Sequence, residues 1–224
     1  MPDYKLSITF LSDWSVGSGL GDGAAADSVI VRDADGLPYL PGRAIKGALR
    51  ESAWRLALAD EKLEPLVDFI FGGADISTGD RVVEEAAERT KTSGRIRVGS
   101  GQLPADLREW LLACDRGARV AYVGDMTSPR RQTSLDKNGQ VVPATLRTIE
   151  CGIPGMTFEC DISLDLPNSP WLAGYIDALC AGVKSVGGDR SRGLGRCRVT
   201  IADSGNQPVR FPSPPPEEIA GELK

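Results

Sequence analysis

The sequence contains no histidine and no Cys-x-x-Cys pair. Histidine is the most frequent general base and a common metal ligand, so its absence argues against serine hydrolases, zinc proteases and histidine-type ribonucleases. The five cysteines are odd in number and widely spread, which argues against a zinc site or a disulfide framework. Any catalysis must therefore use carboxylates, lysines or hydroxyl groups.

Long apolar runs are also missing. No segment approaches the roughly 20 apolar residues that span a bilayer, and the start of the chain lacks the apolar centre of a signal peptide. We therefore expect a cytoplasmic protein without a membrane partner. Apolar residues make up 41% and charged residues 25% of the 224 residues, a balance typical of one self-folding core.

The net charge of -5 argues against nucleic-acid binding only as an average. Acidic side chains are concentrated in residues 60–89, whereas basic side chains gather in residues 43–55 and 184–198. Charges are screened beyond roughly 10 Å at ordinary ionic strength, so a phosphate backbone responds to the local patch. The two basic segments are therefore candidates for nucleic-acid contact.

The apolar pattern predicts an α+β fold. Half-buried strands are expected over residues 4–11, 28–32, 94–98, 155–164 and 196–201. Helices are expected over residues 43–59, 106–114 and 171–183. Because strands and helices interleave, we expect a ferredoxin-like, or RRM-like, sheet with helices on one side.

We expect residues 1–205 to form a single domain with two excursions. The first is an acidic insertion over residues 60–93, and the second is a polar, turn-rich arm over residues 126–147. Between the apolar segment 120–123 and residues 148–150, the arm has the composition of a long protruding hairpin. The proline-rich tail, residues 206–224, is expected to be loose.

Residues 187–195 read Gly-Gly-Asp-Arg-Ser-Arg-Gly-Leu-Gly and lie between a predicted helix and a predicted strand. This order is the reverse of a nucleotide-binding P-loop, and the Gly-Lys-Ser/Thr ending is missing. Glycines let the backbone approach a ligand closely, and Arg190 and Arg192 suit phosphate groups. The alternative is a structural turn. A second glycine-rich loop, residues 16–27, is longer than a hairpin turn needs, and such loops are usually functional.

The loop 187–195 resembles the C-terminal glycine-rich signature of the RAMP superfamily, the RNA-binding subunits of CRISPR effector complexes. Residues 27–33 and then 36–50 resemble the backbone subunits of type III complexes, which show an aspartate, an apolar run, a turn and a "PYIPGSSLKGxLR"-like helix start. Residues 145–150 with 154–158 give a third, weaker match. The resemblance implies a RAMP core with inserted loops and a thumb-like β-hairpin over residues 126–147.

The resemblance also implies partners and sites. Subunits of this kind stack head to tail with copies of themselves or with related subunits along a guide RNA, beside other effector subunits, and the thumb interrupts the pairing of guide and target RNA. The candidate RNA-binding residues come from both glycine-rich loops, the start of the first predicted helix and the arm: Gly17, Ser18, Gly19, Gly42, Arg43, Lys46, Arg50, Arg130, Arg131, Gly187, Gly188, Arg190, Ser191, Arg192 and Gly193. For the basic row on the helix, the plain alternative is a solvated surface.

Asp27 matches the loop aspartate that drives metal-dependent cleavage of target RNA in catalytic backbone subunits. The resemblance therefore implies an endoribonuclease that uses a divalent cation, expected to be Mg²⁺. The alternative is that Asp27 only caps a turn. The chain also departs from the family pattern, since residues 94–101 lack an acidic residue of the "GRLxFxDA" motif and residues 133–136 replace an Ile-Asp-Arg triplet.

Three other functions stay open. An inactive backbone or capping subunit would share most of these signatures. A guide-processing ribonuclease of the same superfamily is disfavoured by the absence of histidine. A general RNA-binding module is disfavoured because no aromatic-rich strand is visible.

Overall fold

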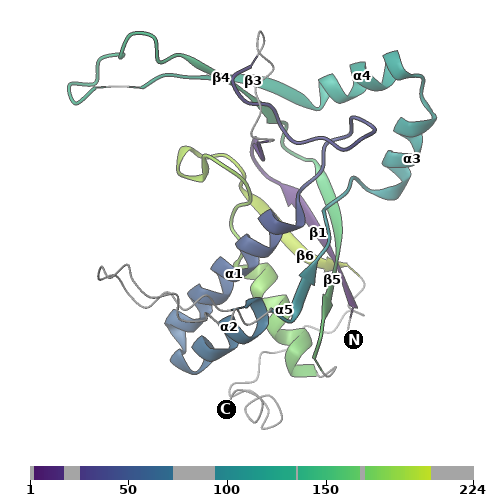
Figure 1. The fold of residues 1–224 in the computed structure, drawn as a ribbon, viewed down its shortest axis with the longest axis vertical. Coiled ribbons are helices and arrows are strands. Elements are labelled where there is room, and N and C mark those ends of the chain that lie inside the picture. The colour runs from purple at the N-terminus through teal and green to yellow at the C-terminus, as the bar shows by residue number, and fades with distance from the viewer. Residues whose placement is uncertain (1–2, 18–25, 73–93, 135, 167–169, 203–224) are drawn as a thin grey trace, which may run out of the picture.

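A four-stranded antiparallel sheet forms the centre of the protein (Figure 1). The computed structural model describes residues 3–17, 26–72, 94–134, 136–166 and 170–202. Four strands lie in the order β2-β5-β1-β6: β1 (Asp3–Phe10), β2 (Ile96–Val98), β5 (Thr157–Leu164) and β6 (Cys197–Ala202). In the register of the sheet, Leu6 of β1 lies opposite Cys160 of β5 and Ile201 of β6.

Alternation along the strands gives the sheet one apolar face. In β1, Leu6, Ile8 and Phe10 are fully buried, while Ser7 and Thr9 between them are partly exposed. Strand β5 repeats this pattern, with Phe158 and Ile162 among its buried residues. The period of two in the sequence therefore predicted the strand faces correctly.

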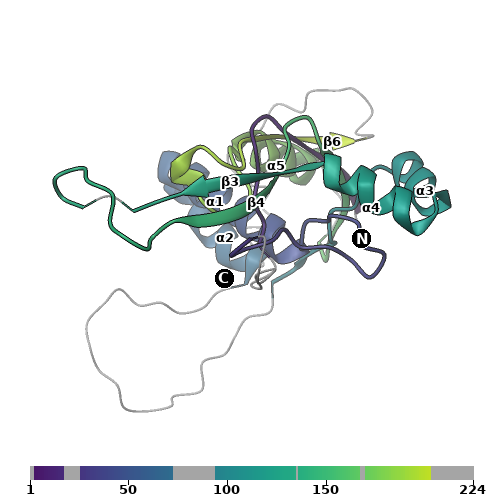
Figure 2. The same cartoon turned by 90° about the horizontal axis from the view of Figure 1, so that it is seen from above.

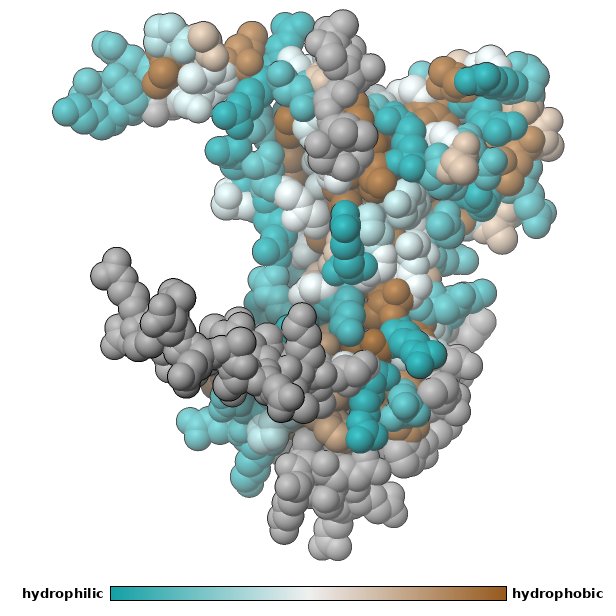
Figure 3. All heavy atoms as spheres, in the orientation of Figure 1, coloured by the Kyte–Doolittle hydropathy of each residue, from teal (hydrophilic) through white to brown (hydrophobic). Residues whose placement is uncertain are grey.

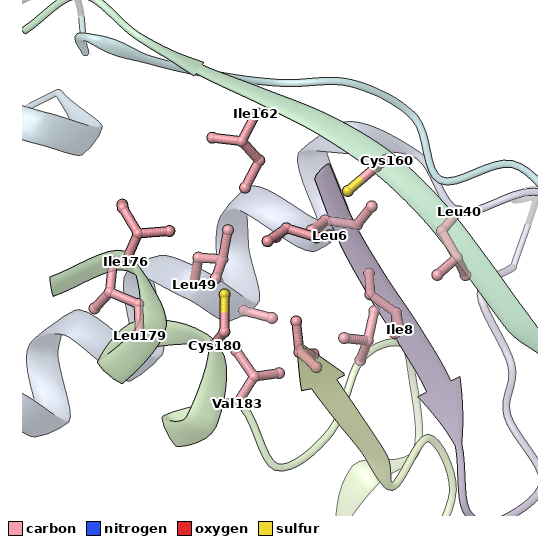
Figure 4. Packing of buried hydrophobic residues seen from close by; sticks show 14 of the residues in the cluster. Leu6, Ile8, Leu40, Leu49, Cys160, Ile162, Ile176, Leu179, Cys180 and Val183 are labelled. Atoms are coloured by element: carbon pink, nitrogen blue, oxygen red, sulfur yellow. The ribbon is translucent and has the colours of Figure 1, made fainter. Parts of the chain in front are cut away.

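Helices α1 (Gly42–Ala59) and α5 (Pro170–Gly182) cover this apolar face. Leu49 of α1 and Leu179 of α5 point toward the β1 side chains in Figure 4. The two helices approach closely: the buried Ser52 hydroxyl of α1 donates a hydrogen bond to the Leu179 carbonyl of α5 at 2.8 Å. A Cβ on Gly182 would lie 2.0 Å from that hydroxyl oxygen, so the contact requires glycine.

The α+β class predicted from the sequence is confirmed. In the main sheet, strands and covering helices follow one another as β1, α1, β2, β5, α5 and β6. The finer assignment, a ferredoxin-like core, stays a prediction. No helix in the described ranges is long and apolar enough to cross a membrane.

The first part of the predicted insertion packs into the core. A 3-10 turn (Glu61–Leu63) leads into helix α2 (Glu64–Phe71), whose apolar side is buried against the main cluster. The remainder of the predicted insertion and the predicted proline-rich tail lie outside the described residues.

Two short helices follow β2, and one of them corrects the sequence prediction. Helix α3 (Ala105–Ala113) was expected, but α4 (Arg116–Asp125) contains residues 120–123, which were expected to flank the hairpin. Asp115 starts α4 by accepting a hydrogen bond from the backbone N–H of Ala118 at 3.0 Å. Val123 is buried on the inner side of the helix. The apolar character of residues 120–123 therefore reflects a helix with one buried position and not a strand.

The predicted segment 28–32 is not a regular strand. Its residues make single bridges, between Gly17 and Ile30 and between Ser28 and Ile149. It therefore joins the loop after β1 to a second, two-stranded sheet formed by β3 (Thr127–Gln132) and β4 (Arg147–Gly152).

Candidate nucleic-acid interface

The glycine-rich loop is held against the segment that follows β1. The Gly188 N–H donates to the Ser15 carbonyl at 2.8 Å, and the Gly195 N–H donates to the Asp13 carbonyl at 2.7 Å. Gly187 has a φ of 105°, and a Cβ there would lie 2.5 Å from the Ser15 carbonyl oxygen. The loop therefore needs glycine in order to pack against the protein, besides any need of a ligand.

The centre of the loop presents its arginines outward. Residues Arg190–Arg192 form one 3-10 turn, entered through Asp189 with a φ of 49° and left through Gly193 with a φ of 84°. Arg190, Ser191 and Arg192 are all exposed. The left-handed backbone at both ends allows the chain to turn within a few residues. The exposed positions of Arg190 and Arg192 agree with their prediction as ligand-facing residues.

Both arginines have acidic partners. Arg190 pairs with Glu51 of α1, which also pairs with Arg55. Hydrogen bonding by Arg190 is the main reason that the pKa of Glu51 lies below its usual value. Arg192 pairs with Asp189 at 3.0 Å. The guanidinium groups are therefore held in place while 44% of the Arg190 side chain and 64% of the Arg192 side chain stay exposed.

The start of α1 lies beside this loop. The helix has Pro41 as its N-cap, no capping side chain and no acidic residue in its first turn, so its positive end is not neutralised locally. A Cβ on Gly42 would lie 2.3 Å from the Val98 carbonyl oxygen, so glycine allows the helix to start against the end of β2. Arg43, the next residue, is exposed.

Two neighbouring hollows meet at Arg43. One, of about 420 Å³, runs between α1 and the glycine-rich loop and is lined by Gly187, Gly188 and Arg190 among others. The other, of about 500 Å³, extends toward Val98 and Ser100 at the end of β2. Both are lined by Gly17, Pro41 and Arg43, so together they form a groove across the start of α1. We call this the α1 groove.

The three basic residues predicted to form one row on α1, Arg43, Lys46 and Arg50, have different surroundings in the structure. The Lys46 ammonium donates to the Ile96 carbonyl at 3.2 Å, and burial together with the nearby charge of Arg50 lowers the pKa of Lys46. Arg50 pairs with Asp68 of α2 at 3.1 Å. Neither residue lines the hollows that form the α1 groove. Only Arg43 of the row therefore lies in the groove.

The predicted hairpin projects from the body (Figures 1 and 2). Its strands β3 and β4 pair from Thr127 opposite Gly152 to Gln132 opposite Arg147, and its surface is largely hydrophilic (Figure 3). At the far end, the Asp136 carboxylate accepts hydrogen bonds from the N–H groups of Asn138 and Gln140, both at 2.8 Å. The polar, turn-rich segment at residues 136–140 therefore forms the tip of the hairpin, as the sequence predicted.

Side chains at the base of the hairpin contact the glycine-rich loop. Arg130 donates to the Arg192 carbonyl at 3.4 Å, and Gln132 accepts from the Arg192 guanidinium at 2.9 Å. The Gln132 amide also donates to the Asp189 carboxylate at 3.4 Å. Arg131 is exposed beside them. The loop and the hairpin, predicted separately, therefore form one continuous surface.

Asp27 lies beside β4, the other strand of the hairpin base. Its backbone N–H donates to the Thr148 carbonyl at 2.8 Å, and its exposed carboxylate accepts from the Thr148 N–H at 2.7 Å. One carboxylate oxygen therefore has a structural partner. Within the ranges that the structure describes, no group of three or more potential metal ligands occurs. Ser18 and Gly19 lie outside the described residues.

Sequence reasoning missed the polar partners of the arginines. Glu51 was the only acidic residue within the basic segment 43–55, and Asp189 stood beside Arg190, so both left a signal in the sequence. Gln132 left none, because its role depends on a hairpin that folds back to a loop 57 residues further along the chain.

Comparisons with solved structures give the same architecture. A chain of the type III-B Cmr-beta complex in its apo state is 11% identical, with a TM-score of 0.61, covering 90% of this chain and 98% of that chain. A chain of the Cmr-beta complex bound to cognate target RNA is 12% identical, with a TM-score of 0.62, covering 90% and 97% respectively. A chain of a type IV-B CRISPR complex is 15% identical, with a TM-score of 0.60, covering 99% of both. At these identities the likeness concerns the fold.

The family comparison covers the sheet, the groove and the hairpin together. No curated protein sequence matches the chain. The model of the RAMP superfamily matches residues 7–198, from within β1 into β6. The match therefore includes Asp27, the start of α1 and the glycine-rich loop, on which the sequence resemblance rested. The chain belongs to the RAMP superfamily.

Proposed function

We propose that this chain is a guide-RNA-binding backbone subunit of a type III CRISPR interference complex. The observation that carries the proposal is the α1 groove, where Arg43, Arg190 and glycine backbone border one hollow at the uncapped start of a helix. Helix starts and glycine-rich backbone both present N–H groups to anions, and arginine binds phosphate in bidentate fashion. The groove therefore suits a phosphate backbone.

The proposed contacts do not read sequence. Arginine and backbone N–H groups bind phosphates of any nucleotide, so base pairing between guide and target would supply specificity. In this proposal, neighbouring copies or related subunits continue the groove head to tail, and other effector subunits complete a cytoplasmic complex. Such a contact is heterologous and open, so the length of the assembly would follow the RNA.

The hairpin is proposed as the thumb that interrupts the guide–target duplex. Its base contacts the glycine-rich loop through Gln132 and Arg130, which fixes its direction relative to the α1 groove. Arg131 is exposed next to these contacts and is available to RNA. The hairpin would thus enter the duplex at a fixed distance from the bound phosphates.

Cleavage of the target RNA is the finer part of the proposal. The Asp27 carboxylate would accept the proton of a target 2′-hydroxyl, whose oxygen attacks the adjacent phosphorus while the 5′-oxygen of the next nucleotide leaves with a proton from water. No histidine is required. The hydrogen bond from the Thr148 N–H orients the carboxylate at the hairpin base, where the duplex would be interrupted.

A divalent ion fits this site only with help from RNA. Asp27 supplies one carboxylate, and the described residues form no cluster of protein ligands around it. Mg²⁺ is commonly held by one or two carboxylates together with substrate phosphates, so Asp27 would serve as one ligand. When bound, the ion would supply stabilisation of the negative charge on the phosphate.

Two variants of Asp27 test the cleavage. Asp27→Asn keeps an oxygen that can accept from the Thr148 N–H but removes the negative charge, whereas Asp27→Ala removes both. We expect both variants, assembled with guide RNA, to bind matched target and to lose Mg²⁺-dependent cutting. Wild-type cutting rates in Asp27→Asn would contradict the catalytic role.

The second candidate is a non-catalytic backbone or capping subunit. The observation that favours it is the same hydrogen bond, because an aspartate that ties two segments together has a structural reason to be present. In that case the assembled wild-type complex binds matched target and cuts at no position that this subunit faces. A guide-processing ribonuclease would instead cut repeat RNA as an isolated chain.

A further inference from the structure

Three side chains join the hairpin to the glycine-rich loop in a closed ring of hydrogen bonds. Gln132, at the end of β3, accepts from the Arg192 guanidinium at 2.9 Å and donates from its amide to the Asp189 carboxylate at 3.4 Å. Arg192 closes the ring with its own bond to Asp189 at 3.0 Å. We call these three residues the Gln132 cluster. Figure 2 shows the loop, in yellow-green, next to β3.

Glutamine suits both of its partners in the cluster. A guanidinium group only donates hydrogen bonds and a carboxylate only accepts them, so a side chain between the two needs one acceptor and one donor. An apolar residue would satisfy neither partner, and an acidic residue would repel the Asp189 carboxylate. The amide of Gln132 therefore meets the requirements of Arg192 and Asp189 together.

The cluster fixes Arg192 without occupying all of it. Both of its side-chain bonds in the cluster use the nitrogen Nη1. The N–H groups on Nε and Nη2 form another edge of the planar guanidinium group, and 64% of the side chain is exposed. Because the group is rigid, holding Nη1 also fixes the direction of this edge. Arg192 can therefore bind a phosphate while the cluster stays intact.

The hairpin is attached to the body beside each of its two strands. Beside β4, Asp27 and Thr148 exchange two hydrogen bonds. Beside β3, the Gln132 cluster holds the outermost pair of the ladder, in which Gln132 lies opposite Arg147. Strands β3 and β4 form a sheet of only two strands, and such a ribbon is marginally stable by itself. The direction of the hairpin therefore depends on these attachments.

We propose that Gln132 couples the binding of guide RNA at the glycine-rich loop to the direction of the hairpin. This inference rests on the proposed function, because it requires a guide phosphate at Arg192. A bound phosphate would restrain the Arg192 guanidinium, which in turn would hold Gln132 and with it β3. Coupling of this kind is reciprocal, so loss of the cluster weakens guide binding as well. Gln132 touches no RNA in this arrangement and is a positioning residue.

Three variants separate the ring of hydrogen bonds from its surroundings. Gln132→Leu removes both bonds of the amide and keeps a side chain of similar volume. The double variant Gln132→Glu/Asp189→Asn restores the ring with its groups exchanged, since the carboxylate then lies on the hairpin and the amide on the loop. Asparagine also tolerates the left-handed backbone at position 189, where φ is 49°. Thr133→Ala is the matched control, because the hydroxyl of Thr133 bonds to that of Thr145 within the hairpin, at 3.1 Å.

The experiment uses the full chain and guide RNA without target. Guide affinity is measured by fluorescence anisotropy, and amide hydrogen exchange is followed over residues 127–132 and 147–152 with and without the guide. In the wild type we expect guide binding to slow exchange in this ladder. Gln132→Leu should lose the slowing and bind guide up to about fivefold more weakly, the effect of one exposed charged contact. A purely structural residue would change exchange equally with and without guide.

The double variant should restore both the slowing and the affinity, and Thr133→Ala should retain both. If Gln132→Leu keeps the slowing and the affinity of the wild type, the inference is wrong, while guide binding that depends on Arg43 and Arg190 would still support the proposed function. A double variant that behaves like Gln132→Leu would also contradict the role of the ring. If the wild-type chain binds no guide RNA, both proposals fail.

Discussion

Arg190 of the glycine-rich loop forms an ion pair with Glu51 of helix α1, although 139 residues separate them in the chain. The pair lies at the wall of the α1 groove, where both residues border the same hollow. The carboxylate therefore occupies one side of a guanidinium group that is proposed to bind phosphate.

Replacing Arg190 with glutamine should weaken binding of guide RNA irrespective of its sequence. One phosphate contact is lost, so the slope of log affinity against log salt should decrease by about one unit or less. The measurement is fluorescence anisotropy over a series of salt concentrations. Arg55→Gln is the control, because Arg55 also pairs with Glu51 but does not line the groove. Equal slopes for wild type and Arg190→Gln would argue against this contact.

Replacing Glu51 with glutamine should have the opposite effect. Without the carboxylate, Arg190 no longer has to leave an acidic partner in order to bind a phosphate. We therefore expect RNA affinity to rise by up to about fivefold, which corresponds to the roughly 1 kcal/mol upper value for one exposed charge pair. The folded-state pKa of Glu51 is lowered, so the carboxylate stays ionised at neutral and mildly acidic pH. The gain should therefore be constant between about pH 6 and 8. Weaker binding would instead identify Glu51 as a residue that orients Arg190.

The Arg32–Glu150 pair should contribute to acid stability. Burial opposes ionisation of Glu150, but hydrogen bonds from Arg32 and the Ile30 N–H outweigh it and lower the pKa. A lowered folded-state pKa means that the contribution is present above the unfolded value, about 4.3, and is lost as the pH falls through the folded value.

Glu150→Gln should therefore cost about 1–2 kcal/mol of unfolding free energy at pH 7. The difference from wild type should shrink between about pH 5 and 3, as measured by urea unfolding at each pH. A difference that stays constant over this range would show that the charge of Glu150 contributes nothing.

Gly152→Ala should destabilise the base of the hairpin. A Cβ at Gly152 would lie 2.1 Å from the ring of Trp14, which is fully buried and stacks on Phe10 at 4.9 Å. The ring has no room to move, so we expect a loss of about 2–3 kcal/mol in urea unfolding. Gly124→Ala is the matched control, because its Cβ meets no atom within 4 Å and alanine favours a helix. Equal stability of the two variants would show that the Trp14 packing can relax.

Local patterns in the sequence were sufficient for most elements of the fold. The period of two in β1 and β5 and the apolar stripe of α1 have one physical cause, the burial of a single face, and they predicted the element types and the buried sides. The exceptions are the segment 28–32, which makes only single bridges, and α4. A short apolar segment is compatible with a strand or a helix, and only the Asp115 cap and the burial of Val123 decided between them.

By itself, the sequence determined the strands, the main helices, the hairpin and two basic segments, because each depends on neighbours close in the chain. Only the tertiary structure decided which basic residues share a surface. It directed Lys46 to β2 and Arg50 to α2, left Arg43 at the α1 groove, and brought Glu51 to Arg190. These pairings depend on how helices pack on the sheet, and contacts between distant segments leave little trace in a single sequence.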